Sequence, residues 1–206
     1  RKYQFEVNFA KCQFLRKKVE FLGYIISNGE VTLSPRHTEA IKQYKMPKTE
    51  HEVQRFLGLT NYFRKFIRDY AHKARPLQNL LKKETKFKID DACVESFNAL
   101  RDALVSTPVL RLYDPAAETE LHTDASSLGL GAILMQKCPD RNWAPVAYFS
   151  RTTNQAEMRY HSFELEMLAV VRAVECFHVY LYGLRFTVVT DCSAIVHAVK
   201  LILTRE

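Results

Sequence analysis

Three acidic residues are placed so that a folded chain could bring them to one site. Asp124 ends an extended run just before the turn-forming sequence Ala125–Gly129, and Asp191 ends a second strand-like run. Glu166 lies in the first turn of a helical run from about Ser162 to Tyr182. Three carboxylates on three elements, two of them at strand ends, are the set that metal-dependent hydrolysis of a phosphodiester requires.

Magnesium is the ion that this chemistry favours. It prefers oxygen ligands and keeps several of its waters. Two such ions, about 3.5–4 Å apart, can stabilise both the attacking and the leaving oxygen. We therefore expect Asp124, Glu166 and Asp191 to act as metal ligands and catalytic groups, with Mg²⁺ as the cofactor and Mn²⁺ as a substitute ion.

Each acid also has a plainer interpretation. A single aspartate at a strand end is usually a turn or cap residue, but Asp124 and Asp191 share the setting Thr-Asp-Ala/Cys-Ser after an extended run. Glu166 falls on the apolar stripe of its helix, where a charge is costly without a partner such as a metal ion. Glu164 falls on a mixed stripe, so we expect a solvated first-turn acid there and choose Glu166.

Composition places the chain among globular proteins. Its 206 residues are 47% hydrophobic, enough for a packed core in one large or two small domains. The sequence has no signal-peptide core and no apolar run near the ~18 residues of a membrane span, so we expect no membrane contact and a piece of a longer soluble chain. The five cysteines are scattered without a C-x-x-C pair, which favours reduced intracellular thiols over disulfides or a zinc site.

Charge divides the sequence into two unlike halves. Residues 1–113 contain 22 Lys and Arg against 12 Asp and Glu, a net charge of +10. Residues 114–206 contain 8 against 11, a net charge of −3. One interpretation is a basic part that grips a polyanion beside an acidic part that collects cations. The alternative is that the basic residues only solvate helices.

The N-terminal residues predict strands. Residues 3–34 are expected to be extended, and the clearest signal is a hairpin in which Asn28-Gly29 joins residues 18–27 to residues 30–33. Asn-Gly tolerates the positive φ angles of a tight primed turn, which suits the twist of two paired strands.

Helices are expected next. Ser34-Pro35 opens one through roughly residue 44, because proline suits the first helical position. The capping box formed by Thr49 and Glu52 begins a helix of about five turns. Asp90 is the expected N-cap of a further helix that ends near Ser106.

The segment from Arg55 to Lys88 is strongly basic. It contains ten Lys and Arg and two acids, with aromatic residues interleaved, and we expect most of those aromatics to be core residues. Binding of nucleic-acid phosphates is instead predicted from the cations taken together, which are Arg64, Lys65, Arg68, Lys73 and Arg75.

The C-terminal part predicts a mixed sheet with helices packed on it. Residues 113–117 are the expected linker, after which three strands, a long helix, a strand and a short helix follow. The ranges are 119–124, 129–137, 144–150, 162–182, 185–191 and 193–201. The whole chain is therefore expected to be α+β, and such a sheet brings strand-end acids together.

In its sequence motifs, the whole chain resembles the reverse transcriptase and ribonuclease H part of a gypsy-type long-terminal-repeat retrotransposon Pol polyprotein. The resemblance rests on an ordered series of motifs from one end to the other. They are Lys11-Cys-Gln-Phe14, Val19-Glu-Phe-Leu-Gly-Tyr-Ile-Ile-Ser27, Arg55-Phe-Leu-Gly-Leu-Thr-Asn-Tyr-Phe-Arg64, Ala74-Arg-Pro-Leu77, Thr107-Pro-Val-Leu110, Thr123-Asp-Ala-Ser126, Tyr160-His-Ser-Phe-Glu-Leu-Glu166, Tyr180-Leu-Tyr-Gly183 and Val188-Val-Thr-Asp191.

The resemblance implies a division of labour along the chain. Residues 1–34 would end the palm, with Phe21, Leu22, Gly23 and Tyr24 in the hairpin that grips the primer. Residues 35–113 would form the helical thumb and connector, and residues 118–206 an incomplete ribonuclease H-like domain.

In that domain the family cuts the RNA strand of an RNA/DNA hybrid, and its acids would correspond to Asp124, Glu166 and Asp191. The implied partners are RNA/DNA hybrid, primer-template nucleic acid and the rest of the Pol polyprotein. The implied location is intracellular, in a cytoplasmic retroelement particle with a nuclear stage.

The chain departs from the family pattern at both ends. The polymerase aspartates of such proteins precede residue 1, so we expect no polymerisation by this fragment, and the fourth ribonuclease H acid would follow residue 206. The alternative function is therefore a non-catalytic nucleic-acid-binding or interaction module derived from such an element. The sequence leaves the oligomeric state open.

Overall fold

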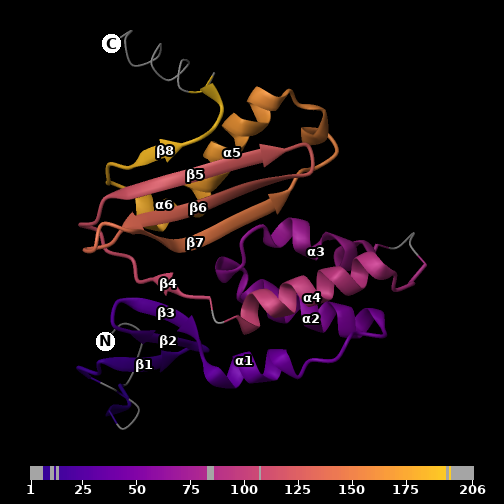
Figure 1. Ribbon diagram of the computed structural model, residues 1–206, viewed down its shortest axis with the longest axis horizontal. Helices are drawn as coiled ribbons and strands as arrows, with labels where there is room; N and C mark the ends of the chain where they lie inside the picture. Colours follow the sequence, from indigo (N-terminus) through magenta and orange to yellow (C-terminus); the bar gives the residue numbers. More distant parts are fainter. Residues whose placement is uncertain are drawn as a thin grey trace.

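The computed structural model describes residues 7–9, 12, 14–82, 86–106, 108–193 and 195. Within that part of the chain there are two four-stranded sheets with helices between and beside them, which confirms the α+β expectation (Figure 1). We call β5–β8 the C-terminal sheet and residues 35–106 the helical region.

The first sheet is antiparallel and has the order β1-β2-β3-β4. Its strands are β1 (Lys18–Phe21), β2 (Tyr24–Ser27), β3 (Glu30–Leu33) and β4 (Leu110–Arg111). The predicted hairpin is confirmed: Ser27 pairs with Glu30, and Asn28 and Gly29 have φ angles of 54° and 77°.

Two expectations for this region are wrong. Residues 18–27 are not one strand, because Leu22 and Gly23, with φ angles of 50° and 81°, form a second tight turn. Glycine suits this turn for two reasons: its φ angle is positive, and a Cβ at Gly23 would lie only 3.0 Å from the ring of His37. The described residues between 7 and 17 also contain no strand.

Four α-helices follow the hairpins, namely α1 (Pro35–Lys42), α2 (Glu50–Tyr62), α3 (Tyr70–Asn79) and α4 (Asp91–Val105). The predicted starts are confirmed, because Pro35 opens α1 and the side chains of Thr49 and Asp90 accept hydrogen bonds from the N–H groups of Glu52 and Cys93. The Thr49 capping box is only half formed, since Glu52 accepts from the N–H of Lys48 instead.

The expected five-turn helix is shorter than predicted. It ends at Tyr62, and a 3-10 helix (Arg64–Phe66) replaces its last turn. Asp69, in the left-handed region with φ of 55°, then redirects the chain into α3, which the sequence did not predict. The apolar spacing continues across this break because Phe63, Phe66 and Ile67 are still buried.

The helical region encloses the larger core. Phe56 packs against Phe97 with ring centroids 4.7 Å apart, and the surrounding side chains from all four helices are buried. Of the aromatics in the basic segment, Phe66 and Tyr70 are buried, as expected, whereas Tyr62 is exposed.

The C-terminal sheet has the order β7-β6-β5-β8, with β8 parallel to β5 and the other pairs antiparallel. Its strands are β5 (Thr119–Ser126), β6 (Gly129–Lys137), β7 (Trp143–Thr152) and β8 (Thr187–Val189). The mixed sheet and the bounds of β6 are confirmed. β8 is shorter than the predicted strand.

The long C-terminal helix also ends earlier than predicted. α5 (Ser162–Cys176) stops at Phe177, and the short α6 (His178–Leu181) follows. The break lets Phe177 and Leu181 bury against Leu121 and Leu134 of the sheet. The helix expected over residues 193–201 falls almost entirely outside the described residues.

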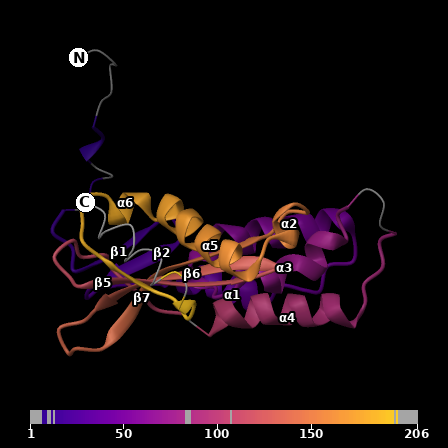
Figure 2. The same cartoon turned by 90° about the horizontal axis from the view of Figure 1, so that it is seen from above.

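Helices cover the C-terminal sheet unequally. Seen from above, α5 and α6 lie on one side of it and α4 on the other (Figure 2). α3 and the 3-10 helix contact β7, where the Ala71 N–H donates to Ser150 Oγ at 2.7 Å and Arg64 donates to the Ser150 carbonyl. Ser150 therefore joins the helical region to the C-terminal sheet.

Candidate active site

Asp124 lies on β5, exposed, opposite Gly131 of β6. The sequence placed it at the strand end, but β5 continues to Ser126 because the hairpin turn is only Ser127-Leu128. Asp124 is therefore held by strand pairing on one side rather than by a flexible turn.

Asp191 reaches the same level of the sheet from β8. The last pair between the two parallel strands is His122 with Val189, and Asp124 and Asp191 each follow two residues later. Because parallel strands advance together, the two aspartates leave the pairing at the same edge. Both are exposed.

Glu166 is buried beside them, with 7% of its surface exposed. Its Oε1 accepts a hydrogen bond from the N–H of Ala125 at 3.2 Å, and its Oε2 is buried without a hydrogen-bond partner. Burial raises the pKa of the Glu166 carboxyl, and the charges of Asp191 and Asp124 raise it further against the Ala125 hydrogen bond. The three acids thus form one electrostatic group.

The start of α5 fixes where Glu166 lies. The His161 side chain accepts from the Phe163 N–H at 3.4 Å, and the Glu164 carboxylate accepts from the His161 N–H at 2.8 Å. Glu164 is exposed and serves as the capping acid, in agreement with the first-turn role expected for it.

A buried ion pair holds the segment that leads into α5, and sequence reasoning missed it. Arg151 of β7 donates two hydrogen bonds of 2.9 Å to Glu157, whose side chain is 8% exposed. Glu157 also accepts from the Asn154 N–H at 2.8 Å. These hydrogen bonds, those from Arg151 first, lower the pKa of Glu157. No periodicity marks such a pair.

The donor chemistry of the site suits a hard divalent cation. Three carboxylates supply oxygen ligands and negative charge, and Glu166 Oε2 has no other partner. The side chains are not closed around one point, because within the described residues no group of three or more His, Cys, Asp or Glu is arranged to hold a metal ion. The residues fit such an ion in type and charge.

Two small cavities flank Asp124, with volumes of about 170 Å³ and 140 Å³. Asp69, from the segment between the 3-10 helix and α3, lines both. A Cβ at Gly131 would lie 3.6 Å from Asp69 Oδ1, an ordinary van der Waals contact, which shows how closely Asp69 approaches β5. No local pattern in the sequence predicts this approach.

The predicted primer-gripping residues lie in the β1–β2 hairpin. Phe21 and Leu22 form its exposed apolar tip, with 60% and 64% of their surfaces accessible. The hydroxyl of Tyr62 on α2 donates to the Leu22 carbonyl at 2.8 Å and so anchors the turn. Tyr24 stacks against Tyr62, and burial, then the neighbouring Tyr62, raise the pKa of Tyr24 to about 12.

Four of the five predicted phosphate-binding cations lie near β7 or the start of α3 and differ in their surroundings, and the fifth, Arg75, is half-buried further along α3. Arg64 contacts the Ser150 carbonyl and lies over the Tyr70 ring, 5.3 Å from its centroid. Lys65 Nζ lies 4.0 Å from the centroid of Tyr24, and burial lowers the pKa of Lys65. Arg64 and Lys65 therefore already have protein partners.

Arg68 is more accessible than Arg64 and Lys65, whereas Lys73 is not. The Arg68 side chain is 71% exposed, lines the smaller cavity beside Asp124 and lies 3.6 Å from the Asp69 carboxylate. Lys73 is half-buried and donates to the Arg68 carbonyl at 2.5 Å.

The remaining candidates have structural surroundings. His122 Nε2 lies 2.7 Å from Glu120 Oε2, and all five cysteines are free thiols. Among the described residues, no helix is both long and apolar enough for a bilayer span.

Comparison with known sequences identifies one part of the chain directly. Residues 89–188 match the family described as "RNase H-like domain found in reverse transcriptase". This range begins before the C-terminal sheet and includes α4 and β4.

Two curated relatives extend the similarity to 90% of the chain. The retrovirus-related Pol polyprotein from transposon 297 of Drosophila melanogaster is 40% identical over 187 residues, and the Tf2-3 polyprotein of Schizosaccharomyces pombe is 36% identical over 187 residues. The chain spans only 17% and 14% of these two proteins.

Solved structures show the same fold. A foamy viral protease-reverse transcriptase in complex with an RNA/DNA hybrid matches 84% of this chain and 24% of its own, with a TM-score of 0.73 and 22% identity. A second structure of that protein, with dsDNA, matches 90% of this chain and 39% of its own, with a TM-score of 0.74 and 21% identity. Residues 89–188 thus match the RNase H-like domains found in reverse transcriptase, within a chain that is similar over 90% of its length to parts of transposon Pol polyproteins.

Proposed function

We propose that this chain is part of a retrotransposon reverse transcriptase and ribonuclease H that binds RNA/DNA hybrid and hydrolyses its RNA strand. In the whole protein, copying of RNA into DNA would accompany this hydrolysis. The division into residues 1–34, 35–113 and 118–206 is part of the proposal.

One observation carries it: a buried glutamate, Glu166, faces two aspartates and keeps one oxygen without a hydrogen-bond partner. A buried carboxylate without a partner is costly, and two nearby negative charges raise that cost. A bound cation would offset this cost, because it neutralises the three negative charges and contacts the free oxygen of Glu166. The retention of all three acids favours hydrolysis over a purely structural role.

The residues have distinct tasks in the mechanism. Asp124, on a paired strand, and Asp191, past the end of β8, hold their carboxylates toward the site from two strands. Glu166 contributes its free oxygen from α5, while the Ala125 N–H fixes the other. Mg²⁺, or Mn²⁺ in its place, would supply activation of water and stabilisation of the departing oxygen.

Nucleic acid would be held by its shape and its phosphates. The exposed tip of Phe21 and Leu22, with Gly23 and Tyr24 behind it, offers an apolar contact. Arg68 offers a cation at the smaller Asp124 cavity, and Lys73 follows on α3. No base-specific contact is required, because an A-like duplex is recognised through its backbone and groove shape.

The test is cleavage of labelled RNA in an RNA/DNA hybrid with Mg²⁺ and then Mn²⁺. It compares this chain with a longer piece of the same protein that adds natural downstream sequence. Metal-dependent cutting by either chain, lost in Asp124→Asn, supports the proposal. Binding by both chains without cutting by either would instead favour the second candidate, a nucleic-acid-binding module without catalysis.

A further inference from the structure

We propose that a basic groove between α3 and α4 is a second nucleic-acid contact, which binds the phosphodiester backbone of the strand leaving the hydrolase site. This deepens the proposed function, since it assigns a path for the substrate beyond the three acids.

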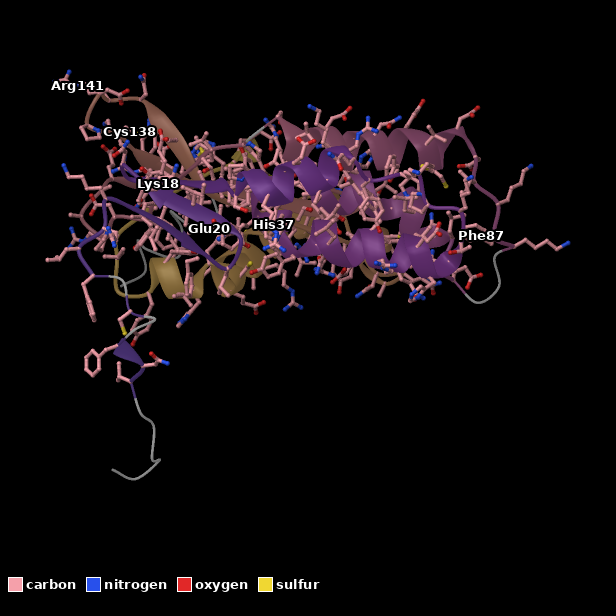
Figure 3. The ribbon with its side chains drawn as sticks, turned by 90° about the horizontal axis from the view of Figure 1, so that it is seen from below. Lys18, Glu20, His37, Phe87, Cys138 and Arg141 are labelled. Atoms are coloured by element: carbon pink, nitrogen blue, oxygen red, sulfur yellow. The ribbon has the colours of Figure 1, made fainter. Side chains whose placement is uncertain are left out.

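The groove has a volume of about 550 Å³. α3 lines one side with His72, Arg75 and Asn79, and the segment before α4 lines the other with Lys86, Lys88 and Asp90. Phe87, between the two lysines, lies at the opposite end of the molecule from Cys138 and Arg141 (Figure 3). The groove is thus far from the turn between β6 and β7, and Lys18 of β1 also lies toward that opposite end (Figure 3).

Its positive charge exceeds its negative charge. Among the described residues, the side chains of Arg75, Lys86 and Lys88 form no hydrogen bond or ion pair, and Lys88 interacts with Asp90 electrostatically without an ion-pair contact. The one acid in the lining, Asp90, accepts the Cys93 N–H at 2.9 Å and caps α4. Arg64 and Lys65, by contrast, have partners inside the protein.

The groove and the cavity at the site of the acids share one lining residue. His72 lines the groove and also lines the larger cavity beside Asp124. A strand with one phosphate at Asp124 can therefore pass His72 and follow α3 to Arg75, which lies one helical turn later on the same face. The one Lys or Arg among the residues that line the larger cavity is Arg151, and it is paired with Glu157.

The lining chemistry defines the ligand class. Three cations and one amide can contact phosphate oxygens, and the lining contains no Phe, Tyr or Trp side chain for base stacking. Such contacts position a nucleic acid without reading its sequence. The groove should therefore bind hybrids of different sequence equally well.

The test is the salt dependence of hybrid binding without divalent ions, so that no cleavage occurs. The triple variant R75Q/K86Q/K88Q is compared with R36Q/K42Q/K45Q, which removes the same charge around α1, on the side of the helical region away from the C-terminal sheet (Figure 1). Each lost phosphate contact lowers the slope of log K against log salt by about 0.9. The groove variant should therefore lose about two to three units of slope and bind roughly a hundredfold more weakly at 0.1 M salt.

Because Arg75 is half-buried, the exposed pair K86Q/K88Q serves as a second variant that does not disturb the helix packing. It should lose about two units of slope. Bound hybrid should also protect Lys86 and Lys88 from acetylation but leave Lys42 and Lys45 reactive. Equal slopes for groove and control variants, or unprotected groove lysines, would overturn the groove.

These outcomes are separable from the hydrolase proposal. If the groove variants bind like the controls while Asp124→Asn abolishes cleavage, the groove is wrong and the hydrolase stands. If the groove variants bind weakly but no form of the chain cuts, the groove stands and the hydrolase is wrong.

Discussion

The two halves of the molecule use charge in opposite ways. In the helical region, Arg64 and Lys65 are drawn into contacts with a carbonyl and with aromatic rings. In the C-terminal sheet, Asp124 and Asp191 are exposed at one edge and Glu166 is buried behind them with an unsatisfied oxygen. Two cations, Arg64 and Lys65, are thus used for packing in the first half, whereas the three acids of the candidate site are left without cationic partners in the second.

This difference indicates which charged residues contribute to stability and which contribute to function. A buried group with raised pKa is destabilising in its charged form, so the protein tolerates Glu166 at a cost. A cation that contacts a carbonyl and a ring stabilises the fold whether or not it touches a ligand. Substituting an acid of the candidate site should therefore lower activity without lowering stability, whereas substituting a packed cation should lower stability.

The largest effect is expected at Asp124. Asp124→Asn removes one metal ligand and one negative charge without changing size, and metal-ion stabilisation of a transition state is worth several kcal/mol. RNA cleavage by the active chain should fall about a thousandfold. Thermal stability should stay equal or rise, because the charge that raises the pKa of Glu166 is gone.

Hybrid affinity in the absence of divalent ions is the control for this variant, and it should be unchanged. A large loss of stability in Asp124→Asn would contradict the contrast between the halves, since it would make the aspartate a structural residue.

The second prediction concerns an acid in the C-terminal half that is compensated. Glu157→Gln leaves the charge of Arg151 without its buried partner, and such a loss costs about 3 kcal/mol of unfolding free energy. The matched control, Glu175→Gln, breaks the exposed Arg172 pair and should cost under about 0.5 kcal/mol. Urea denaturation measures both.

The pH dependence of Glu157→Gln has a definite sign. The pKa of Glu157 is lowered in the folded state, so its stabilising effect is present above the ordinary carboxyl value and is lost as pH falls through the lower folded value. The stability difference between wild type and Glu157→Gln should shrink over that acidic range. A difference that stayed constant there would refute the charge-based explanation.

Local signals predicted much of the fold. Asn28-Gly29 encodes its own turn, and the apolar residues 132–135, which follow the turn-forming sequence 125–129, mark the position of β6. Leu22-Gly23 was missed because leucine rarely adopts positive φ, and only the tethering Tyr62 side chain, 40 residues away, supports it. The end of α5 at Phe177 depends on packing against the sheet, which helical periodicity does not reveal.

The candidate site divides in the same way. Asp124, Glu166 and Asp191 were found because strand ends and helix stripes are local patterns. Asp69 and the Arg151–Glu157 pair were not found, since their positions depend on contacts between segments that are distant in sequence or on burial. Family resemblance added the identity of the acids but not these contacts.

The third prediction compares two neighbouring cations of the helical region. Arg64→Met loses the contacts with Ser150 and Tyr70 and should cost about 1–2 kcal/mol of stability, while the salt dependence of hybrid binding stays the same. Arg68→Met should do the reverse, with little loss of stability and about one unit less salt slope. Equal salt slopes for the two variants would contradict this assignment.

The smallest effect is expected at the hairpin tip. Tyr62→Phe removes the hydrogen bond to the Leu22 carbonyl and should lower the unfolding free energy by about 0.5–1 kcal/mol, because this exposed bond competes with water. Tyr24→Phe is the matched control, since its hydroxyl donates over a longer distance, 3.3 Å, to the Tyr62 carbonyl and should cost less. The effect of Tyr24→Phe should not vary with pH between neutral and mildly alkaline solution, because a pKa of about 12 keeps the Tyr24 phenol protonated there. A larger loss for Tyr24→Phe than for Tyr62→Phe would mean that the hydrogen bond from the Tyr24 hydroxyl, not the tether to Leu22, holds the tip in place, because both variants keep their rings.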